Sequence, residues 1–295
     1  MPPSTGHPNL RSSADIETRR EATFDLMKLY RDKVVWITGA SSGVGEGLAK
    51  AFAEAGAWLV LSARRALELE RVRKNLAASR VLVLPMDVTQ PQDIEGAVRT
   101  VAQHFGRVDV LVCNAGVGQH SRVADTTLDT YRRILEVDLF AVVAHIKAVL
   151  PQMHAQGTGH IVVTSSVAGK FGMPSLSGYC AAKHAVQGFC DSLRAEEAEH
   201  GIDVSTLILA GVKSQFSRSS LTGDGRPYGK STPIDDVSMP AIEAGRTIVT
   251  ALAAGRPEIE VIADRRARKA LFLQRLRPRS VYRRMAEIAR LPGWN

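Results

Sequence analysis

The run YCAAK places a phenol and an amine at a spacing that suits proton transfer. Tyr179 and Lys183 are four residues apart, and residues four apart on a helix share one face. A phenol by itself has a pKa near ~10 and is a poor base at neutral pH, but an ammonium beside it favours the phenolate and lowers that pKa. The pair therefore indicates a general acid/base device, although this spacing also occurs by chance in ordinary helices.

A glycine-rich segment, TGASSGVGEG, follows a short β-branched run at 34–38. Gly39, Gly43 and Gly45 would let the backbone turn tightly from strand to helix and approach a pyrophosphate. The N-terminal end of the following helix would attract the phosphate charge. The alternative is an ordinary glycine-rich turn, which the position after a first strand disfavours.

The end of the second predicted strand reads LVLSARRALE. A carboxylate at this place would bind a ribose 2′-hydroxyl, whereas an arginine accommodates a 2′-phosphate. Arg64 and Arg65 stand here, and guanidinium groups match phosphate geometry. The sequence thus favours NADP(H) over NAD(H), and two solvated arginines at a helix start are the alternative.

The elements that must position these residues follow a regular alternation. Helical segments separate short β-branched runs at 34–38, 58–62, 81–84, 108–113, 160–164, 204–209 and 258–262. This predicts an α/β fold, a single Rossmann-type doubly wound parallel sheet with helices on both faces. We expect a flexible lead with a short helix from Ser13 to Tyr30 (1–30), a dinucleotide-binding catalytic domain (31–263) and a basic helical C-terminal extension (264–295).

Composition favours a cytoplasmic protein with a sizeable core. The chain has 295 residues, of which 45% are hydrophobic. Cys113, Cys180 and Cys190 give neither a disulfide framework nor a metal-ligand spacing, so we expect no metal. No apolar run reaches the ~18 residues that a membrane helix needs, and the N-terminus lacks the apolar core of a signal peptide.

The formal charge of +8 lies in the last segment of the chain. Residues 264–295 hold ten basic and two acidic residues, so the rest of the chain is neutral. Two short helices broken near Pro278 are predicted there, with Val281, Met285 and Ile288 on one face. This face would dock on the domain or a neighbouring subunit, or it would contact an anionic membrane at its periphery. Nucleic acid is disfavoured, because aromatic residues for base stacking are scarce.

Further motifs stand in a specific order. DVT lies at 87–89, CNAG at 113–116, and TSS ends at Ser166, thirteen residues before Tyr179. Together with the glycine segment and YCAAK, they make the chain resemble the classical short-chain dehydrogenase/reductases over roughly residues 31–262. The segments SSVAGKFG, DGRPYG and PEIEV are similar to the branch that includes steroid, retinol and lipid-type dehydrogenases.

The resemblance implies a role for each motif. Tyr179 would act as general acid in carbonyl reduction and as base in alcohol oxidation, while Lys183 would lower its pKa and hold the nicotinamide ribose. Ser166 would hydrogen-bond the substrate oxygen, and the cofactor would carry the hydride. The remaining cofactor contacts would come from Ser41, Ser42 and Val44 in the glycine loop, Asp87 and Val88 beside the adenine, and Asn114, Ala115 and Gly116 beside the nicotinamide.

Two departures from the family pattern matter. Asp138 stands where the family has a catalytic asparagine, 28 residues before Ser166. Its charge would keep Lys183 protonated and partly offset the effect of Lys183 on Tyr179, or the side chain would merely fill the space of the asparagine. After the sixth strand, Ala210-Gly211 replaces the usual Pro-Gly, and we expect Gly211, Val212 and Ser214 to contact the cofactor.

Residues 215–240 form a long polar segment that, in the family, closes over the substrate. The segment carries no charge cluster aimed at a substrate carboxylate or phosphate, which favours a moderately apolar carbonyl compound or alcohol. We therefore predict an NADP(H)-dependent oxidoreductase. We also expect the protein to form a homodimer or a homotetramer. The alternatives are an NAD-dependent relative, a dinucleotide-binding sensor without turnover, and a protein that acts at a membrane surface.

Overall fold

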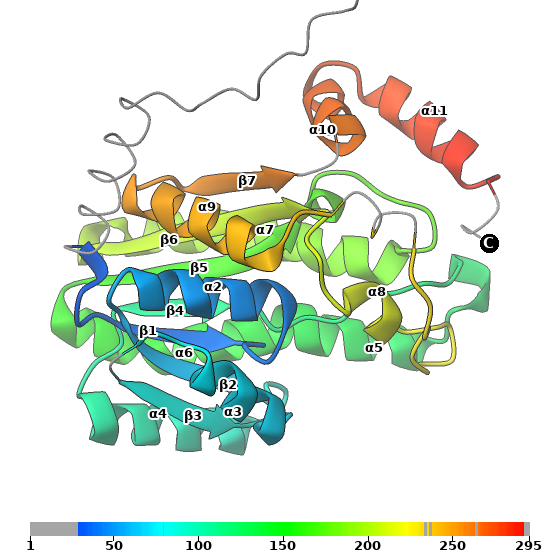
Figure 1. Ribbon diagram of the computed structural model, residues 1–295. Helices are drawn as coiled ribbons and strands as arrows, with labels where there is room; N and C mark the ends of the chain where they lie inside the picture. Colours follow the sequence, from blue (N-terminus) through cyan, green and yellow to red (C-terminus); the bar gives the residue numbers. More distant parts are fainter. Residues whose placement is uncertain (1–28, 79, 233–234, 236–237, 263–264, 292–295) are drawn as a thin grey trace, which may run out of the picture.

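A seven-stranded parallel sheet forms the centre of the molecule, in the order β3-β2-β1-β4-β5-β6-β7 (Figure 1). The computed structural model describes residues 29–78, 80–232, 235, 238–262 and 265–291. The strands are β1 (Val34–Thr38), β2 (Trp58–Ala63), β3 (Val81–Pro85), β4 (Val110–Cys113), β5 (Gly159–Ser166), β6 (Ile202–Ala210) and β7 (Glu258–Ile262). All seven predicted strands are present, and each begins and ends within two residues of its predicted position.

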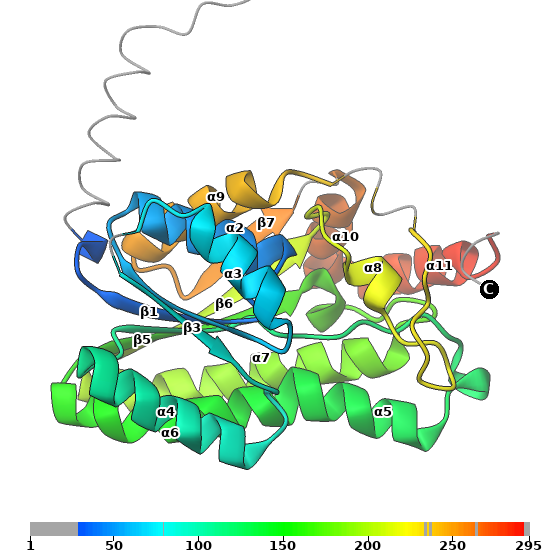
Figure 2. The same ribbon diagram turned by 60° about the horizontal axis from the view of Figure 1, so that its bottom comes forward.

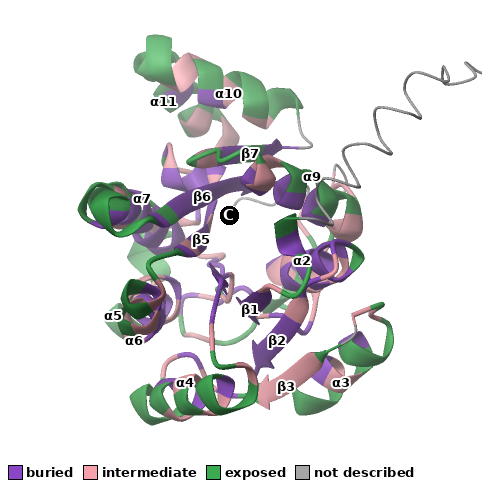
Figure 3. Cartoon of the chain, turned by 90° about the vertical axis from the view of Figure 1, so that its left-hand side faces the viewer, coloured by how far each residue is buried: buried purple, intermediate pink, exposed green. Residues whose placement is uncertain are grey.

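Helices cover both faces of the sheet (Figures 2 and 3). The α-helices are α2 (Gly43–Glu54), α3 (Ala66–Lys74), α4 (Pro91–Phe105), α5 (Leu128–Leu135), α6 (Ala141–Gln156), α7 (Ser177–Glu197), α8 (Phe216–Ser219), α9 (Ala241–Ala253), α10 (Arg265–Leu276) and α11 (Pro278–Ile288). Helices α2, α3 and α9 share one apolar core with the sheet, and α4, α6 and α7 share another. The strands are apolar on both faces because both are covered, which confirms the predicted doubly wound fold.

The chain direction across the sheet reverses between β1 and β4. From β1 the chain moves outward to β2 and β3, and from β4 it moves the opposite way to β7. The loops that leave the carboxyl ends of β1 and β4 therefore separate at this point and open a crevice. Open α/β sheets bind their ligands in such a crevice.

The C-terminal helices α10 and α11 pack on the domain beside β7 (Figure 1). Leu271 and Val281 are buried in an apolar cluster with Phe171, Ile208 and Ile262. The chain breaks where predicted, because Pro278 begins α11 and the residue before a proline avoids helical geometry. An apolar face of the extension thus docks on its own chain.

Two sequence predictions concern the ends of the chain and membranes. The short helix predicted from Ser13 to Tyr30 lies outside the described residues except for its last two, and Tyr30 packs edge-on against Phe52 with ring centroids 5.1 Å apart. Within the described ranges, no helix combines the length and hydropathy needed to cross a bilayer.

Candidate active site

Asp138 sits in a π-helical turn, η2 (Glu136–Phe140), between α5 and α6. Single π turns inside helices often occur at functional sites. The side chain is fully buried. Its Oδ2 accepts a hydrogen bond from the Val117 amide at 2.9 Å, and its Oδ1 lies 2.9 Å from Nζ of Lys183. Both carboxylate oxygens are therefore engaged, one with the loop after β4 and one with α7.

Tyr179 and Lys183 lie in the first two turns of α7, on the face toward the sheet. Both are buried, and the ammonium lies 5.6 Å from the centre of the Tyr179 ring. Lys183 also donates a hydrogen bond of 3.0 Å to the Thr164 carbonyl on β5. The spacing seen in the sequence thus places the phenol and the ammonium together, and Asp138 and Thr164 fix the ammonium.

Ser166 is the last residue of β5, and its hydroxyl caps the short 3-10 helix η3 (Val167–Gly169) by accepting from the Ala168 amide at 3.1 Å. It lines the same cleft as Tyr179 and Lys183. Strand β5 and helix α7 bring these side chains together, because the carboxyl end of β5 and the first turn of α7 lie at the same end of the sheet.

Burial dominates the protonation of this group. Burial raises the pKa of Tyr179, and Asp138 raises it further, while Lys183 and a hydrogen bond with Ser166 act in the opposite direction. Burial lowers the pKa of Lys183, but Asp138 and Tyr179 outweigh it, so the pKa of this amine lies above its ordinary value. The predicted lowering effect of Lys183 on the Tyr179 pKa is therefore present, and burial sets the net upward direction of that pKa.

The pKa of Asp138 is also set by opposing effects of burial and charge. Burial raises the pKa of its carboxyl group, and the ammonium of Lys183 and the Val117 amide partly reverse that effect. The expectation that Asp138 favours a protonated Lys183 agrees with this geometry. The contact is direct, because the two charged atoms are within hydrogen-bond distance.

The loop after β1 has glycine at positions where other residues would be strained or would clash. Gly39 and Gly43 have φ angles of +67° and +56°, which side chains other than glycine rarely adopt. A Cβ on Gly45 would lie 2.3 Å from the Gly39 carbonyl oxygen, and one on Gly43 would lie 2.7 Å from Cβ of Ser214. The loop therefore packs tightly on itself and on Ser214, and it forms a cradle at the N-terminus of α2, where Ser41, Ser42 and Val44 also line the cleft.

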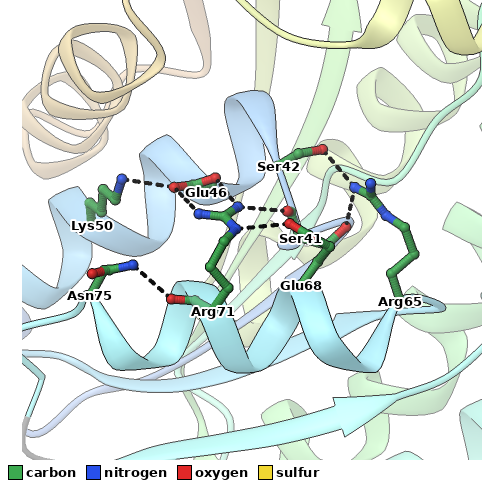
Figure 4. Close-up of polar contacts among 8 residues, drawn as sticks. All are labelled: Ser41, Ser42, Glu46, Lys50, Arg65, Glu68, Arg71 and Asn75. Atoms are coloured by element: carbon green, nitrogen blue, oxygen red, sulfur yellow. Dashed lines mark hydrogen bonds and ion pairs between the residues drawn. The ribbon is translucent and has the colours of Figure 1, made fainter.

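Arg65 reaches the glycine loop from the start of α3, as Figure 4 shows. One terminal nitrogen donates to the Ser41 hydroxyl at 2.9 Å and to the Ser42 hydroxyl at 3.0 Å. Arg64 is exposed and lines the same end of the cleft. The two predicted arginines thus stand beside the cradle, at one end of the cleft, and Tyr179 and Lys183 stand at the other.

Arg71 is a loop contact that sequence reasoning missed (Figure 4). It donates to the Ser41 carbonyl at 3.3 Å and to Glu46 at 2.8 Å. The hydrogen bond from Arg71, followed by that from Lys50, lowers the pKa of Glu46 to about 2. The local sequence gave no signal for this bridge, because Arg71 and Glu46 are 25 residues apart.

The loops after β3 and β4 line the cleft next to the glycine loop. Asp87 accepts from the amide and the hydroxyl of Thr89, so its carboxylate forms a local turn while it and Val88 line the cleft. Asn114 donates from its side chain to the Thr38 carbonyl at 3.0 Å and ties this loop to β1. Ala115 and Gly116 follow it along the cleft wall.

Gly211, Val212 and Ser214, after β6, line the cleft. Gly211 has a φ of +70°, Val212 forms a bridge with Met239, and the Ser214 hydroxyl accepts from the Phe216 amide. Phe216, which no sequence argument selected, packs its ring 5.3 Å from the centre of the Tyr179 ring. The polar composition of residues 215–240 concealed this aromatic contact.

The cleft is a single cavity of about 840 Å³ in the described part of the chain. Met173, Leu176 and Phe216 pack beside Tyr179. The lining of the cavity also includes polar side chains, among them Gln119, His120, Ser217, Thr232 and Asp235. Such a cavity can hold an elongated polar molecule along the strand ends and a small apolar one beside Tyr179.

Comparison with known proteins agrees with this geometry. Residues 33–224 match the family model described as short chain dehydrogenase. A Drosophila melanogaster protein named dehydrogenase/reductase SDR family protein 7-like is 40% identical over 263 residues, which cover 87% of this chain and 80% of that protein.

Two solved structures share the fold. A short-chain dehydrogenase from Streptomyces avermitilis has a TM-score of 0.74 and 26% identity, with 88% of this chain and 97% of that chain covered. The alcohol dehydrogenase of the archaeon Thermococcus sibiricus, complexed with 5-hydroxy-NADP, has a TM-score of 0.68 and 27% identity, with 79% and 96% covered.

Proposed function

The chain belongs to the short-chain dehydrogenase/reductase family, and from this premise we propose that it is an NADP(H)-dependent oxidoreductase that interconverts an alcohol and its ketone or aldehyde. The observation that carries the proposal is the meeting of Ser166, Tyr179 and Lys183 in one cleft with the glycine loop at the switch point of the sheet. We further propose residues 31–263 as the catalytic unit.

The residues present fit a nicotinamide dinucleotide. The cradle formed by Gly39, Gly43 and Gly45 has no room for Cβ atoms at Gly43 and Gly45, and it opens at a helix N-terminus that favours a pyrophosphate. Asp87, Val88, Asn114, Ala115 and Gly116 would line the rest of that molecule. When bound, the nicotinamide would supply hydride transfer.

The protein would hold and move the proton. Tyr179 would donate its hydroxyl proton to the oxygen of a carbonyl substrate and take it back during alcohol oxidation. Ser166 would donate a hydrogen bond to the same oxygen as negative charge develops on it. Lys183, held by Asp138 and Thr164, would stabilise the phenolate, and Phe216 would keep water from it.

Arg64 and Arg65 support NADP(H) over NAD(H). Both stand at the cradle, and Arg65 is already oriented by Ser41 and Ser42. No carboxylate precedes Glu68 at this place, so a ribose 2′-hydroxyl would lack its usual acceptor. The 5-hydroxy-NADP bound by the Thermococcus sibiricus relative supports the same choice.

The substrate would be moderately apolar. Met173, Leu176 and Phe216 pack beside Tyr179 in the cavity, and these apolar groups agree with the predicted likeness to the steroid, retinol and lipid-type branch. A homodimer or homotetramer and a cytoplasmic location remain predictions from the sequence.

The test is a panel of ketones, aldehydes and alcohols, followed by the ultraviolet absorbance of the reduced nicotinamide with each of the two cofactors. We expect turnover with NADPH or NADP⁺ that Tyr179→Phe abolishes. Tyr131→Phe is the matched control, because Tyr131 bonds Ser177 outside the cleft. Dinucleotide binding without turnover of any substrate would instead favour a dinucleotide-binding sensor without catalytic activity.

The cofactor choice has its own test. Replacing Arg64 and Arg65 with glutamine should weaken NADPH binding by roughly 1.5–3 kcal/mol for each lost charge-assisted bond and leave NADH binding unchanged. Arg73→Gln is the control, because Arg73 pairs with Glu70 on α3 and does not line the cleft. Equal affinity of the unmodified protein for NADPH and NADH in calorimetry would refute the choice.

A specific observation also favours contact of the C-terminal extension with a membrane surface. Although Leu271 and Val281 are docked, Phe272, Leu276 and Tyr282 remain exposed among arginines, a combination that suits anionic lipid. The full-length protein should sediment with anionic vesicles and not with neutral ones. Substitution of Phe272 and Tyr282 by serine should abolish this sedimentation, and unchanged sedimentation would refute the contact.

A further inference from the structure

A cluster of two histidines and a glutamate lies near the amino end of the strands, at the end of the sheet opposite the cleft. His154 is in the last turn of α6, which leads into the amino end of β5, and Glu197 ends α7. His200 ends the following 3-10 helix, η4 (Ala198–His200). Nε2 of His154 is 2.6 Å from Oε2 of Glu197, and the two imidazole centroids are 4.6 Å apart.

We propose that His154, Glu197 and His200 bind a Zn²⁺ ion, separately from the proposed dehydrogenase site. One ligand atom from each residue lies within 4.8 Å of the other two, and this is the one such group among the residues that the structure describes. Two imidazole nitrogens and a carboxylate oxygen are a ligand set that zinc accepts, with water as the fourth ligand.

The geometry needs only small side-chain movements. Bonds of about 2.0–2.1 Å in a tetrahedral arrangement place neighbouring ligand atoms about 3.3 Å apart. The present separations, from 2.6 Å to at most 4.8 Å, bracket that value. Glu197 is only 8% exposed and gives a fixed anchor, whereas His154 and His200, at 40% and 47%, can rotate toward the ion.

The backbone makes this place electronegative independently of the side chains. Helix α6 ends at Gly157 and η4 ends at Gly201, both in left-handed conformation, with φ of +64° and +69°. The two ends touch, since a Cβ on Gly201 would lie 2.8 Å from the Gly157 carbonyl oxygen. Unpaired carbonyls at helix C-termini carry partial negative charge and stabilise a cation.

Carboxylates add to this field. Glu197 contributes a buried negative charge, and Oε1 of Glu199 lies 3.8 Å from Nε2 of His200. With the imidazoles neutral, the cluster therefore has a net negative charge that a divalent ion would neutralise. An ion there would join the ends of α6 and α7, which are separated by 43 residues in sequence.

The competing interpretation is a hydrogen-bonded His154–Glu197 pair that serves packing only. Glu197→Gln distinguishes this interpretation from a zinc site. An amide keeps a hydrogen bond to His154, but it provides neither the charge nor the anionic oxygen that zinc requires. His200→Ala is a second variant, and its exposed position makes it compatible with folding. His104→Ala, an exposed histidine on α4, is the matched control.

The experiment is calorimetric titration of tag-free, chelator-treated full-length protein with Zn²⁺, combined with thermal unfolding and the visible absorption of Co²⁺. We expect one ion per chain, a rise in Tm with Zn²⁺ and a tetrahedral Co²⁺ spectrum. Glu197→Gln and His200→Ala should each weaken binding by more than the ~10–100-fold that loss of a group outside the ligand shell costs, and His104→Ala should bind as the unmodified protein does.

Absence of binding would overturn the proposal. Binding that survives Glu197→Gln and His200→Ala, or that His104→Ala removes equally, would do the same. Turnover is no part of the readout, so the result is independent of the proposed dehydrogenase activity.

Discussion

Replacement of Asp138 by asparagine tests the electrostatics of the proposed active site most directly. The change keeps the size of the side chain and removes one negative charge next to Lys183. If Tyr179 must be a phenolate to accept the proton of an alcohol, the lost charge should make that phenolate easier to form. Alcohol oxidation should therefore begin at lower pH in the variant.

The size of the effect follows from the structure. The ammonium lies 5.6 Å from the centre of the Tyr179 ring and 2.9 Å from the carboxylate. Laid end to end, these distances put the carboxylate at most about 8.5 Å from the ring centre. With the phenolate charge placed at the ring centre and an effective dielectric constant of ~20, two unit charges at that distance repel by ~2 kcal/mol. The rising limb of the oxidation profile should then move by roughly one pH unit.

The substitution should also cost stability. One oxygen of Asp138 accepts a hydrogen bond from the Val117 amide, and the other forms an ion pair with Lys183, whereas the amide of asparagine has only one oxygen. One buried donor loses its acceptor, at a cost of ~1–3 kcal/mol. Denaturant unfolding should therefore show a less stable variant.

The assay is the pH dependence of kcat/KM for alcohol oxidation. Asp109→Asn is the matched control, because Asp109 is buried and accepts from the Val34 amide at 2.8 Å, at the opposite end of β4. It should lose stability without a shifted profile. A profile that stays in place or moves to higher pH in Asp138→Asn would refute the electrostatic reasoning, and so would an equal shift in Asp109→Asn. The shift belongs to the coupled group of Tyr179, Lys183 and Asp138.

Three further outcomes are expected. Gly45→Ala should abolish dinucleotide binding in calorimetry, since its Cβ would lie 2.3 Å from the Gly39 carbonyl oxygen; retained affinity would show that the loop adapts. Glu46 has a lowered pKa of about 2 through Arg71, so its stabilisation is present above the ordinary value of 4.5 and is lost as the pH falls toward 2. Arg71→Gln should flatten the loss of stability over that interval in urea unfolding, and an unchanged slope would contradict this. Phe216→Ala should lower kcat/KM for apolar substrates about tenfold, the order of a lost aromatic contact with its buried area, while dinucleotide affinity stays the same; equal losses in both would place Phe216 elsewhere in the function.

Much of the fold could be predicted because its signals are local. The alternation of β-branched runs with helical segments predicted all seven strands, and the break at Pro278 marked the division of the C-terminal extension. The glycines after β1 were recognisable because a turn with positive φ and a close backbone approach tolerates no side chain. The spacing of Tyr179 and Lys183 likewise predicted a shared helical face, which the structure has.

The sequence by itself thus determined the order of the elements and which residues come to the carboxyl edge of the sheet. Only the tertiary structure decided what surrounds them. The direct Asp138–Lys183 pair, the ring of Phe216 on Tyr179 and the bridge from Arg71 to Glu46 join residues from different elements. The net direction of the Tyr179 pKa also depends on packing, because desolvation outweighs the neighbouring ammonium. Helical and strand periods are properties of short segments, whereas contact distance and burial arise only when the segments pack together.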